Sequence, residues 1–333
     1  MFCPLNSKRR QREIVLESVS QRVGGVETIN EHCLFSPRNW PRFLLGWLLW
    51  LNLPGGFVAT YAQSTQLDRS RFTRPVLRVA DTARQAPPAP DHPLAAPLRM
   101  AREKLAYSQQ EIYDYSAILV KRERVGDALL AHQFISLKVR NERLDSQGGV
   151  AVPFSVYMYF VGPESLKGRE VLWVKGQNKN KLVAHAGSGF AGLLSVWLEP
   201  TSTVAMRDQR YPVYYIGMES LLKQYIVRLE KDRRVGARED FQVQVFKGAR
   251  VDGRVCTCTQ VTHPVHRSYL DNHVTRLFVD DEDNVPIRYV AWDWPTQQGA
   301  SPAIIEEYSY TKVKLNLGLT NSDFDYKNPS YNF

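Results

Sequence analysis

Runs of alternating apolar and polar side chains follow one another over the last two-thirds of this 333-residue chain, roughly from Tyr113 to Leu315. In the segment 154–160, phenylalanine, valine and methionine alternate with serine and tyrosine, and the segment 133–139 alternates in the same way. Side chains in a strand repeat every two residues, so each run indicates pleated surface with a drier and a wetter face. The chain is therefore predicted to be built mainly from β-strands.

Turn residues such as Gly126-Asp127 and Gly162-Pro163 separate these runs. Such short connections favour antiparallel pairing, because parallel strands need long crossovers. The strands are predicted at 113–124, 131–141, 153–161, 169–175, 181–186, 195–198, 203–206, 240–247, 254–262, 273–280, 286–294 and 304–315.

Two helices are predicted beside the strands. The first follows Pro97 and places Leu98, Ala101, Leu105 and Ile112 on one face. The second runs from about Met218 to Asp232, with an apolar stripe at three- and four-residue spacing formed by Met218, Leu221, Leu222, Tyr225, Ile226 and Leu229. The expected fold class is α+β, a strongly curved antiparallel sheet whose concave face is covered by the two helices.

The N-terminal residues 1–62 have the plan of a secretory signal peptide. Arg38 and Arg42 precede the apolar run 43–51, a Pro-Gly-Gly breaker follows, and Thr60-Tyr61-Ala62 supplies small residues at the first and third positions. The apolar run is shorter than the roughly 20 residues that span a bilayer. The alternative is an uncleaved anchor in the inner membrane formed by residues 43–59.

Beyond this segment, residues 63–97 contain six prolines and few large apolar residues, which predicts a disordered tether. Residues 98–327 are predicted to form a single domain and residues 328–333 a tail. The chain is expected to be periplasmic or otherwise extracytoplasmic, close to the membrane through its N-terminal segment.

The formal net charge of +9 is mild and scattered. Residues 1–62 hold seven Lys/Arg and four Asp/Glu, so the remainder carries +6 with bases and acids interspersed. A nucleic-acid partner would require a concentrated basic patch, so none is predicted.

The best candidates for chemistry are histidines. His263 and His266 are three apart around Pro264, which disfavours the helix that would bring their rings together, and His185 stands alone at a strand end. No Gly-x-Ser-x-Gly elbow is present. No catalytic residue, cofactor or metal is predicted; a hydrolase that uses the His263/His266 loop is the enzymatic alternative.

Several segments resemble an uncharacterised family of exported bacterial proteins of unknown function, and more loosely the outer-membrane lipoprotein carrier (LolA/LolB-like) superfamily. The segments that carry this resemblance are 115–123 (YSAILVKRE), 153–160 (PFSVYMYF), 168–174 (GREVLWV), 251–256 (VDGRVC) and 315–325 (LNLGLTNSDFD). The resemblance implies an incomplete barrel lined by apolar side chains, which in the carriers accepts lipoprotein acyl chains. It implies no catalytic residue.

Strands that are apolar on both faces need cover on both, or leave one face to line a cavity. We therefore predict an apolar groove lined by Phe154, Val156, Met158, Phe160, Trp173, Leu221, Leu222 and Tyr225. The predicted function is a non-catalytic envelope protein that shelters a lipid, acyl chain or lipoprotein. The non-enzymatic alternative is an envelope scaffold or regulatory sensor domain that binds a protein partner.

Overall fold

The computed structural model describes residues 91–187, 194–297 and 299–333. The predicted signal peptide or anchor and most of the predicted tether lie outside the described residues. Residues Pro90–Phe333 form one compact unit. No helix in the described part combines the length and the apolarity needed to cross a bilayer.

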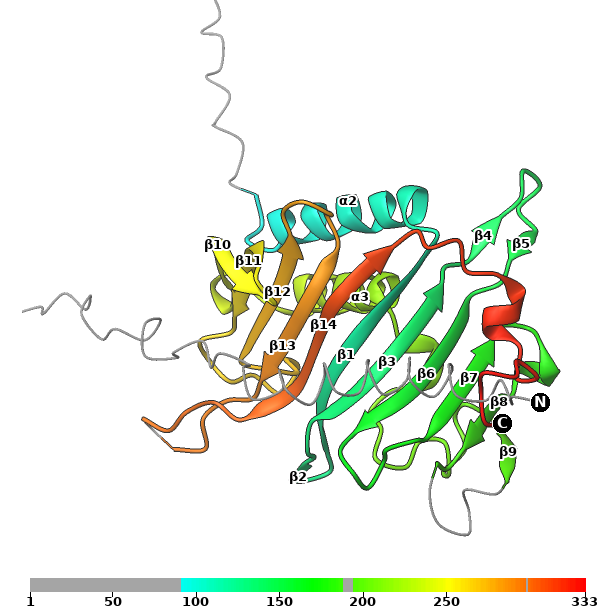
Figure 1. The fold of residues 1–333 in the computed structure, drawn as a ribbon. Helices are drawn as coiled ribbons and strands as arrows, with labels where there is room; N and C mark the ends of the chain where they lie inside the picture. Colours follow the sequence, from blue (N-terminus) through cyan, green and yellow to red (C-terminus); the bar gives the residue numbers. More distant parts are fainter. Residues whose placement is uncertain (1–90, 188–193, 298) are drawn as a thin grey trace, which may run out of the picture. The chain divides into compact units, whose positions relative to one another are not determined.

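One antiparallel sheet of twelve strands dominates the unit (Figure 1). Its order is β10-β11-β12-β13-β14-β1-β3-β6-β7-β8-β9, with β2 paired to β1. The strands are β1 (Asp114–Val125), β2 (Ala128–Leu129), β3 (Gln133–Arg140), β6 (Ser155–Gly162), β7 (Glu170–Val174), β8 (Leu182–His185), β9 (Ser195–Leu198), β10 (Gln242–Val251), β11 (Arg254–Thr262), β12 (Val274–Asp280), β13 (Pro286–Trp292) and β14 (Ile304–Leu315). Within the described residues β10 and β9 are its two edges, so the sheet is the predicted incomplete barrel.

A separate hairpin pairs β4 (Arg143–Leu144) with β5 (Val150–Val152). The prediction of a strand at 203–206 is wrong, because this segment folds into successive turns. Met206 N donates to Ser202 O at 2.9 Å, and Gln209 N donates to Met206 O at 3.1 Å. The backbone groups that a strand would pair with a neighbour are thus used locally.

The two predicted helices are α2 (Ala95–Glu111) and α3 (Met218–Val235), and both lie on one side of the sheet, behind the strands in Figure 1. α2 begins two residues before Pro97, which falls in the first turn, where a missing N–H loses no helical hydrogen bond. α3 begins after Gly217, whose φ of 110° suits glycine. Met218 N donates to the hydroxyl of Tyr115 on β1 at 2.9 Å, which fixes the start of α3 against the sheet.

Buried apolar side chains on the inner face of the sheet form two clusters. The first joins α2 and α3 to β11–β14, and Leu98, Leu222, Leu229 and Leu277 in it are at most 1% exposed. The second lies over β1, β3, β6 and β7, extends to residues of β10–β14 such as Cys258 and Phe278, and is covered in part by the segment that precedes α3. The two helices thus cover the first cluster, and the second runs across both halves of the sheet.

The opposite face of the sheet is partly covered by the C-terminal residues. The Tyr331 ring stacks on Tyr157 of β6 at 3.9 Å, and Asn332 N donates to Glu170 of β7 at 3.2 Å. Residues 328–333, predicted to be a tail, therefore pack on the domain.

Candidate functional site

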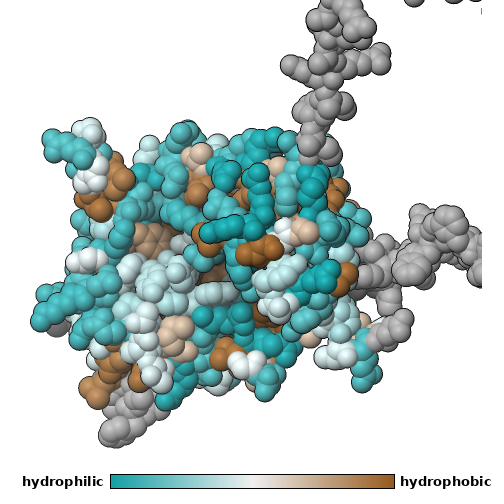
Figure 2. All heavy atoms as spheres, turned by 180° about the vertical axis from the view of Figure 1, so that it is seen from behind, coloured by the Kyte–Doolittle hydropathy of each residue, from teal (hydrophilic) through white to brown (hydrophobic). Residues whose placement is uncertain are grey.

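A cavity of about 610 Å³ lies between the inner face of the sheet, α3 and the segment 199–216, which joins β9 to α3. Figure 2 shows this side of the molecule, with apolar surface recessed among hydrophilic residues. Cavities of several hundred Å³ lined mainly by apolar groups are typical of small-molecule sites. The apolar lining includes Leu119, Ile135, Met158, Phe160, Val171, Leu182, Ala184, Val213, Ile216 and Leu221.

The floor of the cavity is set by strand register. Tyr310 pairs with Leu119, Leu119 with Ile135, and Ile135 with Phe160. Phe160 N donates to Arg169 O at 2.9 Å, which extends the row to the start of β7. Residues that are paired across neighbouring strands point to the same face, so this row lines the cavity from β14 to β7.

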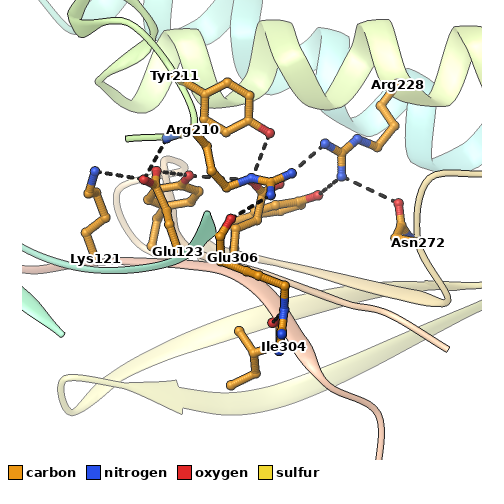
Figure 3. A network of polar contacts seen from close by, with 11 residues as sticks. Lys121, Glu123, Arg210, Tyr211, Arg228, Asn272, Ile304 and Glu306 are labelled. Atoms are coloured by element: carbon orange, nitrogen blue, oxygen red, sulfur yellow. Dashed lines mark hydrogen bonds and ion pairs between the residues drawn. The ribbon is translucent and has the colours of Figure 1, made fainter. Parts of the chain in front are cut away.

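A network of charged and phenolic groups forms another part of the lining (Figure 3). Glu123 on β1 and Glu306 on β14 are register partners, and their exposed fractions are 3% and 2%. Like charges that face each other directly across two strands are destabilising unless they are compensated. Lys121 Nζ, which lies 3.0 Å from Glu123 Oε2, supplies part of that compensation.

The rest comes from segments distant in sequence. Arg210 Nε donates to Glu306 Oε2 at 3.2 Å, and the Tyr211 hydroxyl donates to the same oxygen at 2.8 Å. From α3, Arg228 Nη2 donates to Glu306 Oε1 at 3.3 Å. The network therefore connects the sheet, the segment before α3 and α3 itself.

Both carboxylate oxygens of Glu123 also accept hydrogen bonds, as those of Glu306 do. Glu123 Oε2 also accepts from Arg210 N at 3.0 Å, and Glu123 Oε1 accepts from the Tyr308 hydroxyl at 2.5 Å. Each of the four carboxylate oxygens of Glu123 and Glu306 thus accepts at least one hydrogen bond. A carboxylate that is held in this way stabilises neighbouring cations and is poorly placed to take a proton from a substrate.

Burial shapes the titration of the groups around these carboxylates. Burial, with Glu306 and Glu123 adding to it, raises the pKa of Tyr308 well above its ordinary value. Burial is also the main cause that raises the pKa of Tyr211. Burial lowers the pKa of Lys121, and Glu123 opposes this shift. The tyrosines therefore remain neutral donors to the two carboxylates at neutral pH.

Four of the eight predicted groove residues line the cavity: Met158, Phe160, Leu221 and Tyr225. The other four pack in the two cores. Val156 and Trp173 are buried in the core over β6, with the Phe154 ring 6.0 Å from Trp173, and Leu222 is buried in the core under α2. Whether the cavity residues hold a ligand stays a prediction.

Two of the three candidate histidines, His263 and His266, pack against other groups of the protein away from the cavity. His263 is 1% exposed; its Nδ1 lies 2.5 Å from Asn272 O and its Nε2 lies 3.7 Å from Asp232 Oδ2. The His266 ring packs edge-on against Trp294 at 4.6 Å. Neither residue lines the cavity, whereas His185 does. In the described parts of the chain, no group of three or more His, Cys, Asp or Glu is placed to hold a metal ion.

The polar network was not predicted from the sequence. One signal was available, since Leu119, Lys121 and Glu123 fall on one face of an otherwise apolar strand, where charges need partners. Nothing in the sequence pairs them with Arg210 or Arg228, which come from segments more than eighty residues away.

The sequence family described as "Protein of unknown function (DUF1571)" matches residues 112–333. The chain belongs to this family. Membership of a family of unknown function is thereby confirmed. No curated protein matches the chain significantly.

Some solved structures match the chain at low sequence identity. A DUF1329 family protein from Desulfovibrio piger is 10% identical, with a TM-score of 0.31 over 71% of this chain and 98% of that one. The MucA/MucB complex of Pseudomonas aeruginosa is 13% identical, with a TM-score of 0.38 over 69% of this chain and 60% of that one. A LolA superfamily protein from Nitrosomonas europaea is 10% identical, with a TM-score of 0.26 over 68% of this chain and 97% of that one. It belongs to the superfamily that the sequence loosely resembles.

Proposed function

We propose that this chain is an exported cell-envelope protein that binds a lipid or the acyl chain of a lipoprotein in the cavity under α3. The observation that carries the proposal is the cavity of about 610 Å³, whose floor is a cross-strand row of apolar and aromatic side chains. Transfer of an acyl chain from water to such a surface contributes about 0.8 kcal/mol for each buried methylene.

The proposed role is binding without catalysis. The buried carboxylates beside the cavity are fully engaged with Lys121, Arg210, Arg228 and tyrosines. His263 and His266 face a tryptophan and backbone groups away from the cavity. His263→Ala and His266→Ala should accordingly leave ligand uptake unchanged; hydrolysis of a fatty-acid ester by the wild type that is lost in either variant would favour the hydrolase alternative.

Export rests on the N-terminal pattern of arginines, apolar run and small residues. N-terminal sequencing of envelope material should find a start at or near Gln63. Full-length protein in the cytosol would contradict export, and intact protein in the membrane would identify residues 43–59 as an anchor.

Ligand binding is tested by titrating the delipidated chain with a fluorescent fatty acid. Wild-type protein should show saturable uptake. Ala184→Phe places a ring in the cavity without removing any existing contact and should reduce uptake, whereas Ala128→Phe, exposed on β2, is the matched control and should not. Absence of saturable uptake by the wild type would overturn the proposal.

The second candidate function is a protein-binding module. Its motive is a set of apolar side chains that line the cavity and are also exposed to solvent by 40–67%: Leu194, Val196, Val204, Tyr215 and Val227. Exposed apolar patches of this kind mark interaction sites. A variant with Val204→Ser and Val227→Ser that still takes up fatty acid but loses an envelope partner would support this role.

A further inference from the structure

We propose that Arg169 and Arg207 form an anion-binding subsite in the wall of the cavity, so that the ligand is an amphiphile whose acyl chain ends in a carboxylate or phosphate. This inference rests on the proposed binding function. It adds the chemical class of the head group.

The charges that line the cavity are unevenly paired. Five cationic side chains line it, and three of them lie within 3.3 Å of a carboxylate: Lys121 beside Glu123, Arg228 beside Glu306 and Lys231 beside Asp271. Within the described residues, the guanidinium groups of Arg169 and Arg207 make no hydrogen bond or ion pair. Arg169 is half-buried and Arg207 is exposed, so both guanidinium groups are free to pair with the head group of an anionic ligand.

Arg169 is held in place by its backbone. It closes the cross-strand row of the cavity floor, where Phe160 N donates to its carbonyl, and its own N–H donates to Leu166 O at 3.1 Å. Its guanidinium carbon lies 5.6 Å from the centre of the Phe160 ring. The apolar floor therefore ends directly at a positive charge, which matches the order of groups along an acyl chain and its head.

The charges beside Arg169 come from both signs. Burial is the main cause that lowers the pKa of Arg169; Asp208, which also lines the cavity, opposes this shift, and the positive charge of Arg207 adds to it by a smaller amount. An arginine nevertheless stays charged at neutral pH, so the two groups repel each other. Asp208 is exposed and forms no ion pair with either arginine in the described structure. A carboxylate or phosphate would relieve the repulsion through bidentate hydrogen bonds.

The network around Glu306 is a poorer candidate for this role. Its cations Arg210 and Arg228 already hold that carboxylate, and Lys121 holds Glu123. An anionic ligand there would have to displace a buried carboxylate of the protein, which has no other partner to move to.

The test compares ligands of one chain length that differ in head group. The full chain, delipidated, is titrated with palmitic acid, palmitoyl lysophosphatidic acid and hexadecanol at a pH where both acids are ionised. The wild type should bind the two anionic amphiphiles about tenfold or more tighter than the alcohol, as expected for charge-assisted hydrogen bonds. The anionic ligand whose binding suffers more from loss of the arginines identifies the head group.

Variants locate the preference. Arg169→Gln and Arg207→Gln should each weaken binding of the anions by about tenfold and change hexadecanol binding by less than about twofold. Arg169→Lys keeps the charge and should retain part of the preference. Arg99→Gln, exposed on α2, is the matched control. Thermal melting of each variant checks that the fold is kept.

The outcomes separate this inference from the proposed function. Equal binding of palmitic acid and hexadecanol by the wild type, or equal loss of both in Arg169→Gln, would overturn the anion subsite while leaving the acyl-chain cavity in place. Binding of none of the three ligands would overturn the proposed function itself.

Discussion

The two halves of the sheet are covered in different ways. Over β11–β14, α2 and α3 fill the inner face with an apolar stripe, and Leu222 and Leu277 are fully buried between them. Over β1, β3, β6–β9 and part of β14, the cover is the edge of α3 and the largely irregular segment 199–216, and a cavity remains. A regular helix stripe interdigitates with a pleated face, whereas an irregular segment does not present one continuous apolar side.

The polar network explains how the loose half keeps its shape. Arg210 and Tyr211 connect the segment before α3 to Glu306 of β14, and Arg228 connects α3 to the same carboxylate. Directional hydrogen bonds fix the segment at a defined place without requiring that side chains fill the space below it. We infer that the packed half supplies most of the stability and the open half supplies the binding site.

The largest effect is expected in the packed half. Leu222→Asp places a carboxylate at a fully buried position of α3 and should unfold the domain or release the helix, with a loss above about 4 kcal/mol in the free energy of unfolding. Chemical denaturation measures this loss. Val227→Asp, on the same helix and 59% exposed, is the control and should change stability by less than about 1 kcal/mol. Equal small effects at both positions would show that the stripe does not pack on the sheet.

A somewhat smaller loss is expected in the polar network. Glu306→Ala leaves Arg210 and Arg228 without their carboxylate and should cost about 3–5 kcal/mol, as for a broken buried ion pair. Glu164, 87% exposed beside Lys167, is the control, and its replacement by alanine should cost at most about 1 kcal/mol. If Glu306→Ala proved as mild as the control, the network would not hold the two elements together.

The packed half also contains Asp232, a buried carboxylic acid near the end of α3 whose ionisation lowers the stability of the fold. Burial is the main cause that raises the pKa of Asp232 from 3.8 to about 6, and its Oδ1 has no hydrogen-bond partner among the described atoms. Between these two pKa values the folded state binds one proton more than the unfolded state, so stability falls as pH rises through this window.

Asp232→Asn removes this cost. At about 1.4 kcal/mol for each tenfold change in proton affinity, the variant should gain up to about 3 kcal/mol at pH 8 and almost nothing at pH 3. Denaturation of both proteins at the two pH values gives the difference, which includes any change in the titration of His263, whose Nε2 lies 3.7 Å from Asp232 Oδ2. A gain in stability that is independent of pH would mean that the pKa of Asp232 is not raised in the folded state.

The two halves also differ in how far the sequence predicts them. The strands and both helices follow from local periodicity, as in the stripe from Met218 to Leu229, and antiparallel pairing follows from the short turns. Segment 203–206 is predicted as a strand from its run of apolar residues, but it turns on itself and lies at the cavity. Local patterns do not say which backbone partners will be available.

The cavity depends on contacts that are missing from a local pattern. Val156 and Met158 alternate identically on β6 and both are buried in the same core, yet only Met158 also lines the cavity. Arg169 and Phe160 become neighbours only through pairing of β6 with β7. Such differences arise from the path of the cover, which is set by the distant pairs of the polar network.

Native mass spectrometry of the chain purified from cell envelopes tests the central claim, that the open half of the sheet holds a hydrophobic ligand. Wild-type protein should carry an adduct of lipid mass that is released on collisional activation. Ala184→Phe, which fills the cavity, should carry less of it, and Ala128→Phe should match the wild type. A wild-type chain that carries no adduct, or an adduct retained in full by Ala184→Phe, would contradict the account.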